Sequence, residues 1–179
     1  HFYSAERYAS IEALRGVYAW AHAQPLIPVW GGRYARAVED FFVMRIYQRG
    51  PRRFLLEGGP AVRTARFDAP GAVVDLAASR GVLGFRSEQG SLYVHLDESA
   101  AREVVLGPAA GAGPWLEEAN FEVEGWSRSA GGVRFNKRGW WKGSGVLAGC
   151  SPGRAYRVSS GKTTWTTAAS GDGRLRLSF

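Results

Sequence analysis

The clearest pattern of hydrophobic and polar positions runs from Phe121 to Leu147. Apolar and polar side chains alternate from Phe121 to Arg128, and the alternation resumes from Val133 to Lys137 after a short glycine-bearing segment. Period two on both sides of such a turn predicts an antiparallel hairpin. Trp126 is then expected on the polar face. Four apolar side chains are expected to share the buried face: Phe121, Val123, Val133 and Phe135.

Short strands are also predicted through the rest of residues 51–179. Glycine and proline interrupt the apolar runs at intervals of about eight to twelve residues, a spacing typical of an antiparallel β-sandwich. Residues 87–90 are expected to turn a second hairpin, and 107–114 to form a loop. The predicted strands are 53–57, 61–67, 73–76, 82–86, 91–96, 103–106, 145–147, 155–158, 162–167 and 174–178.

Residues 1–48 have helical rather than strand spacing. Ser10 is suited to cap a first helix, and Pro25 is expected to stop it. A second helix is predicted from about Arg33 to Tyr47. Its apolar stripe is unusually wide, so we expect it to pack on a neighbouring layer, which could lie outside this chain.

The amino-acid composition of the chain limits which classes of function are expected for it. Hydrophobic residues make up 45% of the chain, enough to build a core. The formal net charge is +7, carried by 20 arginines and 3 lysines. These cations are scattered rather than clustered, so nucleic acid is not expected as a partner. No apolar run is long enough to span a bilayer. Cys150 is the only cysteine, which excludes an intrachain disulfide and a cysteine-based metal site.

Residues suited to catalysis are few. The histidines are His1, His22 and His95, and His95 lies in a predicted strand without a ligand-type neighbour, so a structural role is expected. The pairs Glu117-Glu118 and Glu122/Glu124 are expected to be solvated surface carboxylates. No nucleophile elbow, phosphate loop or zinc-protease motif occurs.

Tryptophans suggest a binding role for the β-rich part. Flat aromatic faces stack on pyranose rings, and neighbouring amide or cationic groups add directional hydrogen bonds. The alternative is that two or more of the indoles belong to the core, and one ring of an adjacent pair on a strand is expected to be buried. The candidate carbohydrate-binding residues are Trp126, Trp140, Trp141, Trp165 and Asn136, with Arg128 and Lys142 as further donors.

Residues 1 to about 47 also carry a local motif. It begins with His1-Phe2-Tyr3-Ser4, continues with a predicted helix and the link Gln24-Pro25-Leu26-Ile27-Pro28-Val29, and ends with a helix beginning near Tyr34. This stretch resembles the Pel-type exopolysaccharide deacetylases, bacterial envelope proteins whose catalytic domain is similar to the NodB-like carbohydrate esterases. The β-rich remainder looks, more loosely, like that family's C-terminal sandwich. The family's metal-binding Asp-His-His set and catalytic Asp lie upstream of the matching residues and are absent here.

The resemblance implies a hydrolase of N-acetylated aminosugar polymers, acting on biofilm exopolysaccharide in the periplasm or outside the cell. In such enzymes a divalent metal, here expected to be zinc, polarises the acetamide and activates water. His1 matches by position the histidine that protonates the leaving amine. Residues 1–48 are thus expected to be the helical end of a deacetylase-like domain, and 51–179 a sandwich that contacts glycan or supports that domain.

The chain alone is expected to be inactive, because one histidine without metal and base does not hydrolyse an acetamide. Its helices are expected to pack on the rest of the deacetylase domain or on another chain. Two alternatives stay open: a stand-alone carbohydrate-binding or adhesion module, and a protein–protein assembly domain. A deacetylated polymer is cationic and would be repelled by a chain of charge +7, so a neutral acetylated glycan or a purely supporting role is expected.

Overall fold

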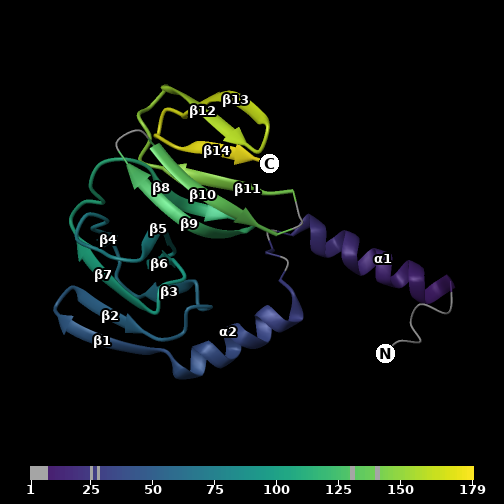
Figure 1. Ribbon diagram of the computed structural model, residues 1–179, viewed down its shortest axis with the longest axis horizontal. Helices are drawn as coiled ribbons and strands as arrows, with labels where there is room; N and C mark the ends of the chain where they lie inside the picture. The colour runs from purple at the N-terminus through teal and green to yellow at the C-terminus, as the bar shows by residue number, and fades with distance from the viewer. Residues whose placement is uncertain (1–7, 25, 28, 130–131, 140–141) are drawn as a thin grey trace.

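The computed structural model describes residues 8–24, 26–27, 29–129, 132–139 and 142–179. Two helices, α1 (Tyr8–Ala23) and α2 (Gly31–Val43), precede a series of antiparallel strands (Figure 1). The predicted fold class, mainly β with sandwich-like antiparallel sheets behind two helices, is confirmed. Figure 1 shows α1 extending away from the sheets, whereas α2 lies beside them and leads directly into the first strand.

The first seven strands enclose one hydrophobic core between two sheets. One sheet contains, in order, β1 (Arg45–Gly50), β2 (Arg53–Glu57), β7 (Ala101–Gly107) and β4 (Val73–Val74). The other contains β3 (Thr64–Phe67), β6 (Ser91–Leu96) and β5 (Val82–Glu88). Buried apolar side chains from both sheets meet between them: Leu56, Ala65, Val74, Leu76, Phe85, Leu92, Val94, Leu96, Val104 and Leu106.

The remaining strands enclose a second core. A central sheet contains β14 (Leu175–Ser178), β11 (Ser144–Ala148) and β8 (Trp115–Ala119). Two hairpins accompany it: β9 (Glu122–Ser129) with β10 (Gly132–Arg138), and β12 (Ala155–Ser160) with β13 (Thr163–Ala168). Their buried residues include Leu116, Phe121, Val123, Leu147, Cys150, Leu175 and Leu177.

The two cores meet where β5 passes β8. On β5, Leu83 contributes to the second core and Phe85 to the first, with a register shift between Val82 and Gly84 in the pairing with β6. A Cβ atom at Gly84 would lie 2.1 Å from the carbonyl oxygen of Leu116, well inside van der Waals contact. The absence of a side chain at position 84 therefore allows the two halves to pack this closely.

The predicted hairpins are confirmed. The turn between β5 and β6 shows why its sequence pattern predicted a hairpin. Glu88 pairs with Ser91, and the two residues between them, Gln89 and Gly90, have φ values of 50° and 81°. Two consecutive left-handed residues are typical of the type I′ turn, whose twist matches that of the flanking strands.

The predicted second helix is too long, and two strands, β1 and β8, were not predicted. The helix ends at Val43 rather than near Tyr47, and residues 45–50 form β1, which pairs with β2. β8 was not predicted because two of its five residues, Glu117 and Glu118, resemble a solvated carboxylate pair. In the structure β8 instead pairs with β11 and contributes Leu116 to the second core.

Candidate functional site

The side of α2 that faces the sheets carries polar residues. Arg33, Ala37 and Asp40 are its least exposed residues, and Met44 continues the same face just beyond the helix end. This spacing of three to four residues defines one stripe of a helix. The buried carboxylate of Asp40 accepts a hydrogen bond of 2.7 Å from the backbone N–H of Ala61. The chain therefore anchors α2 through this stripe, which we call the polar stripe for its charged residues Arg33 and Asp40, while Met44 packs against the first core.

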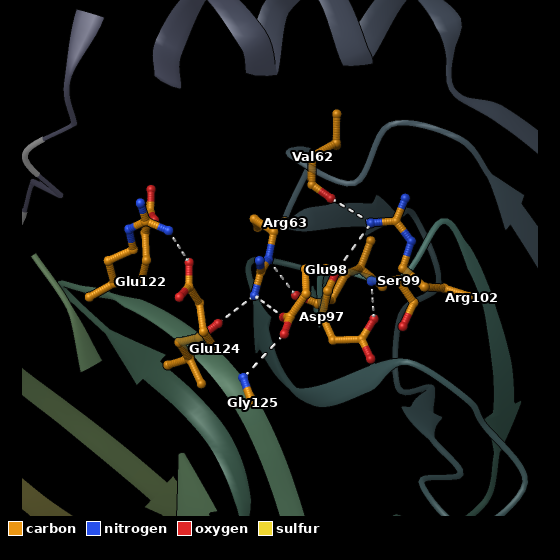
Figure 2. Close-up of polar contacts among 12 residues, drawn as sticks. Val62, Arg63, Asp97, Glu98, Ser99, Arg102, Glu122, Glu124 and Gly125 are labelled. Atoms are coloured by element: carbon orange, nitrogen blue, oxygen red, sulfur yellow. Dashed lines mark hydrogen bonds and ion pairs between the residues drawn. The ribbon is translucent and has the colours of Figure 1, made fainter. Parts of the chain in front are cut away.

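Arg33, near the start of α2, connects the helix to the second half of the chain. Its guanidinium lies 2.5 Å from the carboxylate of Glu122 and 3.6 Å from that of Glu124, both on β9. Figure 2 shows Glu122 and Glu124 near Arg63. Arg63 donates one hydrogen bond across the junction to the carbonyl of Val123 on β9 and another within the first half to the carbonyl of Leu96. Two arginines thus fix the position of α2 and β9 relative to the first half.

A third arginine supports the loop that receives Asp40. Arg102 on β7 is 0% exposed, and its guanidinium donates to the carbonyl of Gly58 at 2.7 Å and to that of Val62 at 2.8 Å. Figure 2 shows the contact with Val62. Burial lowers the pKa of Arg102, although arginine stays charged in proteins. These carbonyls belong to the segment around Ala61, whose N–H binds Asp40. Arg102 therefore stabilises the segment that anchors α2.

Next to the polar stripe, the side of α2 that faces away from the sheets is apolar and exposed. We call Tyr34, Val38, Phe41 and Phe42 the outward apolar face; Tyr34 is 64% exposed, Phe41 63% and Phe42 79%. An amphipathic helix normally buries such a stripe on its own domain, so the arrangement here is inverted. Exposed large apolar residues continue along α1 and the link: Leu14, Val17, Tyr18, Trp20, Leu26, Ile27, Val29 and Trp30. Surfaces of this kind mark interaction sites.

A second feature is a cleft between β10 and β12, above β11 and β14, which we call the hairpin cleft. Its volume is about 610 Å³, within the usual range for ligand sites. Phe135, Tyr156 and Phe179 supply aromatic lining, and Asn136 and Ser159 are among its hydrogen-bonding residues. This combination of flat rings and polar groups suits a sugar ring.

Trp126 does not lie on the face predicted for it. Its ring stacks on Phe135 at 5.7 Å between centroids and packs against the second core. The reason is a β-bulge: Arg134 pairs with Ser127 but Asn136 pairs with Glu124, so two residues of β9 oppose one of β10. The extra residue reverses the alternation and turns the indole toward the inner face.

The other candidate binding residues fall in different places. Asn136 is exposed and lines the hairpin cleft. Trp165 on β13 is half-buried and contacts Phe179, a cleft residue, at 6.0 Å between ring centroids. His1, Trp140 and Trp141 lie outside the described residues. Sequence reasoning missed Tyr156 and Phe179, because only the docking of two separate hairpins brings them opposite β10.

Neither His95 nor Cys150 has features of a catalytic group. Nε2 of His95 lies 2.9 Å from the backbone carbonyl oxygen of Glu117, and burial lowers the pKa of the imidazole. This hydrogen bond agrees with the predicted structural role. Burial raises the pKa of the Cys150 thiol, which disfavours the reactive thiolate. Across the described ranges, no group of three or more His, Cys, Asp or Glu side chains could hold a metal ion.

No known family, curated protein or solved structure matches this chain. In the part of the chain that the structure describes, neither helix has the length and apolarity needed to cross a membrane.

Proposed function

We propose that the chain is the C-terminal part of a polysaccharide deacetylase of the Pel type. In this proposal α2 packs through the outward apolar face on a deacetylase domain, and α1 packs on it through its own exposed apolar residues. The β-rich part supports that domain and contacts the glycan. The observation that carries the proposal is the inverted orientation of α2, whose polar stripe contacts its own sheets while its aromatic stripe is exposed.

The energetics favour a further layer over these helices. Fully burying one large apolar side chain stabilises a protein by about 1.5–3 kcal/mol. Because Tyr34, Phe41 and Phe42 are largely exposed, their burial contributes little of that stabilisation to the chain. A helix of 13 residues is also marginal in water without tertiary packing. A covering domain would supply both the missing burial and the missing packing.

The proposed chemistry assigns one role to this chain. His1 would protonate the amine that leaves when the acetamide is hydrolysed, because an imidazole exchanges protons near neutral pH. The metal, expected to be zinc, and the catalytic base would come from the deacetylase domain. The isolated chain is therefore expected to be inactive.

Acetate release from an N-acetylated aminosugar hexamer tests this proposal. The isolated chain with added zinc should release none, and the protein encoded by the complete gene should release acetate in a metal-dependent reaction. His1→Ala in that protein should lower kcat by about 100-fold or more, and His22→Ala is the matched control, expected to be neutral. Turnover by the isolated chain, or full activity of His1→Ala, contradicts the proposal.

The hairpin cleft supports a second candidate function, a carbohydrate-binding module without catalysis. In that case the isolated chain binds oligosaccharide, and the complete protein shows no acetate release. Replacing Trp140 and Trp141 together by alanine tests the aromatic platform predicted from the sequence. Unchanged glycan binding by a folded double variant would remove those two residues from the proposed site.

A further inference from the structure

The charged side chains among the residues that line the hairpin cleft are all cationic. Its lining residues include three cations, Arg134, Lys137 and Arg157, and no acidic side chain. About half of the arginines in the described residues form ion pairs with acids, among them Arg33, Arg53, Arg63, Arg66, Arg86, Arg138 and Arg174. Arg134 and Arg157 belong to the other half, because no described carboxylate forms an ion pair with either of them. Two exposed arginines of the cleft lining thus have no acidic partner in the described part of the chain.

The cleft is also lined by aromatic and hydrogen-bonding residues, which the binding of a simple anion would not require. Phe135 and Phe179 border the space together with Tyr156, and Ser159 and Asn136 also belong to the lining. Aromatic faces bind the apolar faces of sugar rings, whereas guanidinium forks match the two oxygens of a carboxylate. A ligand that contacts both the aromatic residues and the arginines of the cleft would therefore contain sugar rings and carboxylates.

We propose that the hairpin cleft binds an acidic glycan, a sugar chain that bears carboxylates alongside neutral or N-acetylated sugars. The proposal rests on the proposed glycan contact of the β-rich part and names its ligand class. A chain of free aminosugars is excluded by the same charges, because cations in the cleft repel protonated amines. Nucleic acid fits less well, because the cations of the chain are scattered and those of the cleft lining lie only on β10 and β12 rather than along an extended surface.

Binding of three hexasaccharides to the isolated chain, measured by calorimetry, tests the ligand class. The probes are hexagalacturonate, the N-acetylglucosamine hexamer and the glucosamine hexamer. We expect hexagalacturonate to bind most tightly, and its affinity to fall between about 50 and 200 mM salt because the contact is electrostatic. The glucosamine hexamer should not bind.

Two double variants that remove equal charge test the location. Arg134→Gln with Arg157→Gln should weaken hexagalacturonate binding by on the order of fivefold, since each exposed charge contact contributes modestly. Arg45→Gln with Arg52→Gln is the control, because both residues are exposed on the β1–β2 hairpin, outside the cleft. It should bind within about twofold of wild type. All four positions are exposed, so both variants should fold normally.

Each other outcome has a defined meaning. Binding of the N-acetylglucosamine hexamer without hexagalacturonate overturns the acidic-glycan proposal and leaves the proposed glycan contact standing. Binding of none of the three overturns both. An equal loss in the two double variants shows that net charge, not the cleft, attracts the ligand. Tighter binding of a single-stranded DNA of equal charge identifies a nucleic-acid site and also overturns the proposal.

Discussion

Removing two rings from the outward apolar face should affect stability only where a partner covers them. The perturbation is the double substitution Phe41→Ala with Phe42→Ala. Phe41 is 63% exposed and Phe42 is 79% exposed, so about a third of one residue and a fifth of the other are buried. Full burial of a phenylalanine stabilises by up to about 3 kcal/mol, so the two lost contributions sum to about 1–2 kcal/mol.

Helix propensity offsets part of that loss. Alanine favours a helix over phenylalanine by about 0.5 kcal/mol per residue, so the double variant of the isolated chain should lie within about 1 kcal/mol of wild type. The matched control is Phe85→Ala in the first core, where the ring is 6% exposed and its loss should cost about 3–5 kcal/mol.

Urea unfolding measures both variants, at several protein concentrations so that self-association is detected. In the protein encoded by the complete gene, the same double substitution should cost about as much as a core phenylalanine, because the covering domain then buries the rings. A loss of 3 kcal/mol or more in the isolated, monomeric chain would refute the reasoning, because it would show that the rings are already packed there.

Three further predictions concern the β-rich part and its link to α2. Gly84→Ala should lower the free energy of unfolding by about 3 kcal/mol, because the new Cβ would clash with the backbone of Leu116. The control is Gly171→Ala, where no atom lies within 4 Å of the new Cβ, and its free energy of unfolding should stay within about 0.5 kcal/mol of wild type. Burial lowers the folded-state pKa of His95, so its contribution to stability is complete above pH 6.5 and is lost as the pH falls toward the folded pKa. Urea unfolding between about pH 7 and 5 should therefore show a flatter pH dependence for His95→Gln, and an unchanged slope would contradict this. Arg33→Gln should speed amide hydrogen exchange in the first turn of α2 while global stability changes by less than about 1 kcal/mol; unchanged exchange would show that the ion pair does not hold the helix.

The hairpins and most strands could be predicted because their signals are local. Strand β2 begins and ends at the predicted residues, and the turn at Gln89-Gly90 is specified by two adjacent positions. Such features depend on neighbouring residues, so the alternation of side chains and the turn residues are sufficient evidence. The mainly β fold class follows from the same signals.

The end of α2 could not be predicted because nothing local stops the helix. Met44, Ile46 and Tyr47 continue the apolar pattern beyond Val43, and no glycine or proline interrupts them. The change to extended backbone depends on pairing of β1 with β2, a contact visible only after both strands are placed.

The candidate site was only partly predictable for a similar reason. The bulge that turns Trp126 inward depends on the pairing of β9 with β10, although Gly125, with φ of 58°, was a local sign of it. The cleft needs two hairpins brought together by tertiary packing. The anchors Asp40 and Arg102 were missed because buried polar residues are recognised by their partners, which lie 21 and about 40 residues away along the chain.

Hydroxyl-radical footprinting of the outward apolar face tests the central claim most directly. Oxidation of Tyr34, Phe41 and Phe42 is compared between the isolated chain and the protein encoded by the complete gene, with Tyr93 of β6 as the reference. The account predicts rapid oxidation of all three rings in the isolated chain and strong protection in the complete protein, with Tyr93 unchanged. Equal oxidation of the three rings in both proteins would contradict it.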